Sequence, residues 1–131
     1  MKKFIVTTTI NQPTLATIKF IEIAVRDNWT FVIIGDTKTP HEEYLELQDE
    51  YTGSLVYLHP AKQTEMYPEL SEIIGWKTIQ RRNIGFVWAY ENGAEIVVTI
   101  DDDNIPYDNW GDNIMIGQEV EVDEYENILQ Y

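Results

Sequence analysis

Residues 95–106 read EIVVTIDDDNIP, and this stretch joins an apolar run directly to three adjacent carboxylates. A short continuous apolar run is typical of a strand that is covered on both faces of a parallel sheet. At an effective dielectric constant near 20, two like charges about 6 Å apart repel by roughly 3 kcal/mol. The stretch therefore predicts a buried strand over 95–100 that ends in an acidic cluster, which a cation would stabilise.

Three more short apolar runs precede this strand and alternate with helical patterns. Right-handed crossovers between successive strands then build a parallel sheet covered by helices. We predict an α/β fold with a Rossmann-like parallel sheet, strand order 3-2-1-4, flanked by helices. The three runs are residues 3–9 (KFIVTTT), 30–34 (TFVII) and 54–58 (SLVYL).

The connections between these runs predict the helices. The first connection has an apolar stripe of Leu15, Ile18, Ile21 and Val25. Asn11 or Thr14 can cap this helix, because either side chain accepts a hydrogen bond from a free backbone N–H. The other helical segments are residues 41–50 and 69–92, with a division at Gly75.

The chain of 131 residues is long enough for one domain with one core. We predict one α/β ligand-binding domain over 1–110. Residues 111–131 would be an acidic segment or the start of an acceptor-binding region. The net charge is −14, and residues 101–131 contain ten acidic residues and no Lys or Arg. This charge argues against binding to nucleic-acid phosphates.

Several further classes of protein are excluded or disfavoured by composition. No apolar run approaches about 18 residues, so no membrane span is predicted. The basic start MKKFIVT leads quickly into polar residues, which favours a first strand over a signal peptide. The absence of cysteine excludes disulfides, thiolate zinc sites and a cysteine nucleophile. We therefore expect a cytoplasmic protein.

The acidic cluster is expected to lie in a ligand crevice. In open parallel sheets, ligands bind beyond the carboxyl ends of the strands where the strand order reverses, here between the first and fourth strands. Alternation along an extended strand would place Asp101 and Asp103 on one side and Asp102 on the other. Ligation by oxygen atoms alone selects a hard ion such as Mg²⁺ or Mn²⁺.

The familiar phosphate-binding loops are absent from the sequence. Neither G-x-x-x-x-G-K-[ST] nor G-x-G-x-x-G follows the first strand. Positive charge for a nucleotide would then come from the metal and from the arginine pair Arg81 and Arg82 in QRRNIGF. The planar fork of arginine suits a phosphate or a base edge.

Four segments in this order resemble GT-A glycosyltransferases, which use nucleotide sugars and carry a D-x-D motif. The likeness is closest to the STELLO-type glycosyltransferase-like proteins and fainter to the reversibly glycosylated polypeptides. It covers about residues 5–104 and implies the donor-binding half of a GT-A fold. The segments are TTTINQPT (7–14), VIIGDTKTP (32–40), YLHPAKQ (57–63) and RRNIGFVWAYENGAEIVVTIDDDN (81–104).

This resemblance implies transfer of a hexosyl or pentosyl group from a UDP-sugar to a glycan or protein acceptor, with Mn²⁺ or Mg²⁺ as cofactor. It implies that Thr8 and Thr9 line the nucleoside pocket. Asp36 would accept a hydrogen bond from the base, and Lys38 would stand on the same rim. No residue is singled out as a catalytic base.

The resemblance also implies roles near the fourth strand. Arg81 would contact the nucleotide, and Asn83 would help to hold the helix in place. Asp101 would face the ribose or a metal-bound water, and Asp102 would lie beside the bound nucleotide. Asp101 and Asp103 would be the metal ligands, with Asp103 on the metal that bridges the diphosphate.

The sequence leaves several alternatives open. A GT-A domain normally continues well beyond its D-x-D motif, whereas only 27 residues follow Asn104. The chain would then be a donor half that acts with further domains or as a homo-oligomer, or a non-catalytic module that binds a nucleotide or a metal. A phosphatase-like hydrolase with a D-x-D motif is a further alternative, although there the motif ends the first strand. Trp110 is a candidate for stacking on a sugar.

Overall fold

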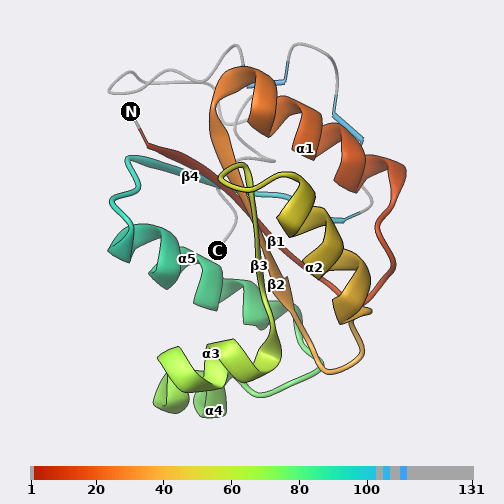
Figure 1. Cartoon of the computed structure of the whole chain (residues 1–131). Helices are drawn as coiled ribbons and strands as arrows, with labels where there is room; N and C mark the ends of the chain where they lie inside the picture. The colour runs from red at the N-terminus through yellow and green to blue at the C-terminus, as the bar shows by residue number, and fades with distance from the viewer. Residues whose placement is uncertain (1, 103–104, 107–109, 112–131) are drawn as a thin grey trace.

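The computed structural model of the chain describes residues 2–102, 105–106 and 110–111. In this part, one four-stranded parallel sheet lies between two layers of helices (Figure 1). None of the helices described is long and apolar enough to cross a membrane. The elements in chain order are β1 (Lys3–Thr9), α1 (Leu15–Asp27), β2 (Trp29–Gly35), α2 (His41–Glu50), β3 (Leu55–Leu58), α3 (Pro60–Met66), α4 (Pro68–Ile74), the 3₁₀ helix η1 (Ile79–Arg81), α5 (Arg82–Glu91) and β4 (Ile96–Thr99).

The sheet has the predicted order, β3-β2-β1-β4, and the three strand pairs are parallel. In the register of the central strand, Ile5 lies between Phe31 of β2 and Val98 of β4. The predicted α/β fold is confirmed, and each predicted strand boundary lies within one residue of the observed one. The apolar runs locate the strands because both faces of the sheet are buried.

Alternating side chains divide the core into two halves. Ile5 and Phe31 face the layer of α1 and α2, where they pack with Phe20 of α1. Val6 and Val32 face the opposite layer, which contains α5. Figure 1 shows these two helical layers on opposite sides of the sheet.

Helix α5 approaches the sheet closely through Gly85. A Cβ atom at Gly85 would lie 2.4 Å from Cγ1 of Val6 and 3.1 Å from Cγ1 of Ile34. The absence of a side chain therefore lets the helix backbone approach the strands, and α5 brings the preceding loop to the carboxyl edge of the sheet.

Helix α1 begins as predicted and buries the middle of the predicted stripe, where Ile21 is buried and Ile18 packs against the core. Thr14 is its cap and accepts a hydrogen bond from the Thr17 N–H, which decides between the two predicted caps. The predicted stripe is wrong at Leu15 and Val25, which are 59% and 55% exposed. The buried face is wider than the predicted stripe and consists of Ala16, Thr17, Phe20, Ile21, Ile23 and Ala24.

The structure has a helix that the sequence pattern did not predict. Helix α3 has seven residues, starts with Pro60 and is capped by the His59 side chain, which accepts from the Ala61 N–H at 3.0 Å. The segment 69–92 is divided at Gly75 as predicted, but η1 comes between α4 and α5. A helix of two turns is too short to show an apolar stripe.

Candidate functional site

A pocket of about 350 Å³ opens at the carboxyl edge of the sheet. Its walls come from the residues that follow β1, β2 and β4 and from the loop that leads into η1. This is the crevice where the strand order reverses, as expected for a ligand site in a parallel sheet. The lining residues are Thr8, Thr9, Ile10, Asn11, Asp36, Lys38, Lys77, Thr78, Ile79 and Asp102.

Asp102 connects the end of β4 to the loop after β1. One of its carboxylate oxygens, Oδ2, accepts hydrogen bonds from Oγ1 of Thr9 and from Nδ2 of Asn11, the latter at 2.8 Å. The Thr14 hydroxyl donates to the backbone oxygen of Asp102 at 3.1 Å. Asp102 thus fixes two walls of the pocket relative to each other, as well as lining it.

The loop after β1 is also held by hydrogen bonds to α2, and the end of β1 is held by a hydrogen bond to β2. The Tyr44 hydroxyl donates to the backbone oxygen of Asn11 at 2.7 Å. Burial raises the pKa of Tyr44 to about 12, so this hydroxyl keeps its proton at neutral pH. The Thr8 hydroxyl donates to the backbone oxygen of Ile34 at 2.7 Å, which ties β1 to β2 at the pocket.

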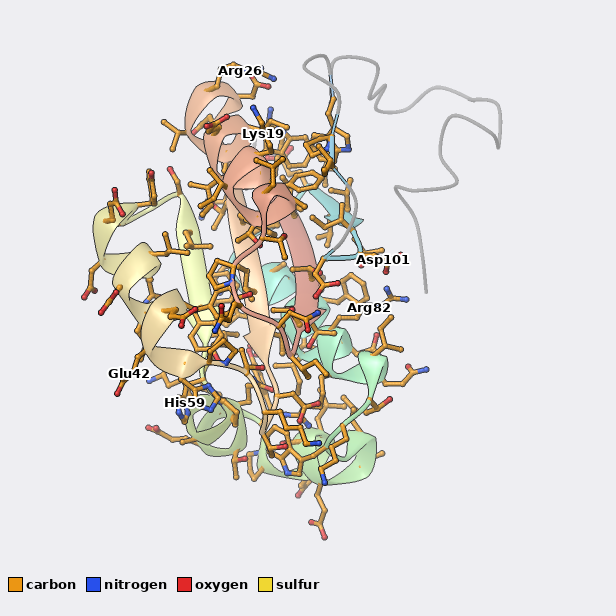
Figure 2. All side chains as sticks on the ribbon, turned by 90° about the vertical axis from the view of Figure 1, so that its right-hand side faces the viewer. Lys19, Arg26, Glu42, His59, Arg82 and Asp101 are labelled. Carbon is orange, nitrogen blue, oxygen red and sulfur yellow. The ribbon has the colours of Figure 1, made fainter. Side chains whose placement is uncertain are left out.

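Asp101 lies beside the pocket without lining it and forms an ion pair with Arg82. The Nη1 atom of Arg82 lies 3.9 Å from Oδ1 of Asp101, and the Asp101 side chain is 45% exposed. Figure 2 shows the two labelled side chains next to each other at the end of β4. The exposed carboxylate leaves oxygen atoms available to a ligand.

The structure describes only part of the predicted metal site. Asp103 lies outside the described residues. Among the residues that are described, no group of three His, Cys, Asp or Glu side chains could hold a metal ion. The carboxylates of Asp101 and Asp102 are nevertheless hard oxygen donors, and their chemistry fits Mg²⁺ or Mn²⁺.

Asp36 lines the pocket, but its carboxylate is held by backbone N–H groups. Oδ1 accepts from the Thr37 N–H at 2.6 Å, and Oδ2 accepts from the N–H groups of Lys77 and Thr78 at 2.8 and 3.3 Å. The side chain is buried, with 1% of the residue exposed. Asp36 therefore fixes the loop before η1 as a wall of the pocket, a different task from the predicted contact with a base.

Arg81 is buried beside the pocket and does not line it. Its guanidinium donates to the backbone oxygens of Ser71 and Gly75 at 3.0 and 3.3 Å, and to the side-chain oxygens of Ser71 and Gln63. It also stacks on Trp76, with 3.7 Å between Cζ and the ring centre. Burial lowers the pKa of Arg81, and the negative charge of Asp36 partly offsets this effect.

Because Arg81 has no exposed surface in this structure, no ligand can touch it in the arrangement described. Its contacts join α3, α4 and η1, so the observed task is to hold the wall of the pocket. Asn83 also has a structural contact nearby. Its Nδ2 donates to Oε1 of Gln80 at 3.1 Å, which joins the start of α5 to η1.

Some of the remaining lining residues were expected at the pocket from the sequence, and others were not. Lys38, Thr8 and Thr9 line the pocket as the resemblance implied, whereas Lys77 was not predicted. Two isoleucines, at positions 10 and 79, are each 53% exposed on its walls. The sequence could place residues 8–12 at this edge, but nothing in it showed that the loop after Gly75 returns there.

Trp110 lies elsewhere. Its ring packs 5.2 Å from the rings of Phe20 and Trp29, measured between ring centres. Trp29 begins β2, so this packing is not at the carboxyl edge where the pocket opens. Trp110 does not line the pocket, and the structure gives it a core role in place of the suggested stacking on a sugar.

Comparison with known proteins does not assign the chain to a family. No protein-family model matches the sequence, and a search of curated proteins finds no significant match.

Proposed function

We propose that this chain is the donor-binding part of a metal-dependent, GT-A-type glycosyltransferase, which binds a UDP-sugar and transfers the sugar to an acceptor. The observation that carries the proposal is that Thr8, Thr9 and Asp102 line one pocket where the strand order reverses. The resemblance of four segments to GT-A enzymes also implies that the nucleotide binds at this edge of the sheet.

Each wall of the pocket has a task in this proposal. The two threonines stand where the nucleoside would lie, and Asn11 is held beside them by Asp102. Asp36 keeps the opposite wall in place through the N–H groups of Lys77 and Thr78. A pocket with both walls fixed before binding loses less conformational entropy when a ligand enters.

The metal would be held by Asp101 and Asp103, with Asp102 beside it. Mn²⁺ or Mg²⁺ bound there would neutralise charge on the departing nucleoside diphosphate. The Arg82 guanidinium, 3.9 Å from Asp101, orients that carboxylate from the α5 side.

A non-catalytic nucleotide-binding module is the second candidate. It is favoured by the hydrogen bonds of the pocket's two described carboxylates. Asp36 accepts from backbone N–H groups, and Asp102 accepts from Thr9 and Asn11, so each supports the shape of the pocket. Both oxygens of Asp36 and Oδ2 of Asp102 are thus engaged in holding the pocket rather than poised for chemistry.

Calorimetric titration of UDP with and without Mn²⁺ tests the proposal. We expect binding that is strengthened by the ion, and we expect Asp103→Ala to remove this strengthening. Binding that is equally tight without metal would count against the metal site. A donor-hydrolysis assay then separates the two candidates, since hydrolysis of a UDP-sugar supports the enzyme and binding without hydrolysis supports the module.

A further inference from the structure

The pocket carries charges of opposite sign on its two sides. On one side, Asp102 accepts hydrogen bonds from Thr9 and Asn11. On the other side stand Lys38 and Lys77. The side with the lysines is therefore suited to an anionic group, and the side with Asp102 to a cation.

The two lysines have no counter-ion in the described part of the chain. No carboxylate oxygen there lies within 4.0 Å of either ammonium group. The Asp36 carboxylate lines the same pocket, but the bonds to it come from backbone N–H groups and the Thr37 hydroxyl, and not from a lysine ammonium group. The lysine charges are thus available to a ligand.

The backbone that carries Lys77 is held in an unusual conformation. Its φ angle is 61°, in the left-handed region that residues other than glycine and asparagine seldom adopt. The hydrogen bond from its N–H to Asp36 at 2.8 Å holds this geometry. The Lys77 side chain is exposed, and it starts from a fixed point on the wall of the pocket.

Arginine does not supply this charge. The Arg81 guanidinium is buried, and each of its four hydrogen bonds goes to an uncharged group of the protein. A phosphate in the pocket would meet the lysine ammonium groups and not the guanidinium. The positive charge of Arg81 lies behind the same wall and adds to the potential there.

We propose that Lys38 and Lys77 form a phosphate subsite that works without metal and contacts the diphosphate of the bound nucleotide from the side opposite Asp102. This inference rests on the proposed function for the identity of the ligand. The ammonium groups would hold the diphosphate on one side, and the metal ion of the proposed function would neutralise its charge from the other.

Titration with inorganic pyrophosphate in EDTA tests the subsite directly. We expect wild-type protein to bind pyrophosphate, and Lys77→Gln and Lys38→Gln each to weaken binding about tenfold, because each removes a charged hydrogen-bond donor. Lys77→Arg keeps the charge and should stay within about twofold of wild type. Lys62→Gln is the matched control, since Lys62 is exposed on α3 and does not line the pocket.

Affinity that is unchanged in Lys77→Gln and Lys38→Gln would overturn the subsite, as would a wild-type protein that ignores pyrophosphate in EDTA. The same variants are titrated with UDP and Mn²⁺ to separate the two proposals. If UDP binds with Mn²⁺ but pyrophosphate does not bind in EDTA, the subsite fails and the proposed function stands. If the lysines bind pyrophosphate but UDP with Mn²⁺ does not bind, the subsite stands as an anion site and the proposed function fails.

Discussion

Replacing Arg81 with methionine separates the two tasks that this residue could have, contact with a nucleotide and support of the fold. Methionine fills a similar space but donates no hydrogen bond. In the structure the Arg81 guanidinium makes four hydrogen bonds inside the protein and stacks 3.7 Å from the centre of the Trp76 ring. The support role predicts a loss of stability, and the contact role predicts a loss of affinity alone.

The size of the loss follows from the groups left behind. The Gln63 side-chain oxygen and the Ser71 backbone oxygen would each lose a donor, and a buried polar atom without a partner costs about 1–3 kcal/mol. The stacking on Trp76 adds about 2 kcal/mol when it is shielded from water. Removing a buried charge offsets part of this, because burying an ion costs several kcal/mol. We expect a net decrease of about 2–4 kcal/mol in the free energy of unfolding.

The neighbouring arginine provides the matched control. Arg82 makes one ion pair at 3.9 Å with a carboxylate that is 45% exposed. Such pairs contribute about 0–1 kcal/mol to stability. Arg82→Met should therefore lower the free energy of unfolding by no more than about 1 kcal/mol. Urea denaturation followed by circular dichroism measures both variants. Equal stability of the two variants, with UDP affinity lost only in Arg81→Met, would refute the reasoning.

Three further predictions test other parts of the structure. Gly85→Ala should lower the free energy of unfolding by about 1–2 kcal/mol, measured by thermal denaturation, because the contact with Val6 outweighs a helix-propensity gain of about 1 kcal/mol; a rise in stability would contradict the close packing. Burial and the charge of His59 lower the pKa of His41 below its ordinary 6.5. The unfolded chain therefore binds the proton first, and the free energy of unfolding should fall as the pH drops below 6.5, less so in His41→Asn; an equal fall in both proteins would contradict this. Asp36→Ala removes the acceptor of two backbone N–H groups, so amide exchange at residues 77 and 78 should be about tenfold faster, while unchanged exchange would show that Asp36 does not hold the loop.

The fold follows from features that are local in the sequence. Each strand is a short apolar run, and the alternation of strands and helices allows few arrangements other than a parallel sheet. The stripe predicted for α1 holds at Ile21 and fails at its two ends, because Ala16 and Ala24 are buried while Leu15 and Val25 are exposed. Small residues at a close contact carry little hydrophobic pattern, although they decide which face packs.

The site was predictable in place but not in detail. The crevice between β1 and β4 follows from the strand order, and the threonines of β1 line it as expected. The two arginines differ because Arg81 is surrounded by Gln63 and Ser71, from α3 and α4, and those contacts join distant parts of the chain. The directions of the Asp101 and Asp102 side chains depend on how the chain turns after β4, which alternation along a strand does not describe.

The loop that carries Lys77 shows the same limit. Residues 75–78 separate two helices in the sequence, and nothing local indicates that they return to Asp36. That contact spans 41 residues and depends on the packing of η1 and α5 against the sheet. Charged residues in such loops can be assigned to a pocket only after the helices around them have been placed.

NMR mapping of UDP binding in the presence of Mg²⁺ tests the central claim most directly, because it reports on every amide at once. A pocket at the carboxyl edge predicts the largest shifts at residues 8–11, 36–38 and 77–79. A second pocket, of about 380 Å³, lies among Lys2, Lys3 and Trp88 at the opposite edge of the sheet and serves as an internal control. Shifts that gather there, or the absence of shifts at saturating UDP, would contradict the claim that this fold binds a nucleotide beside Asp102.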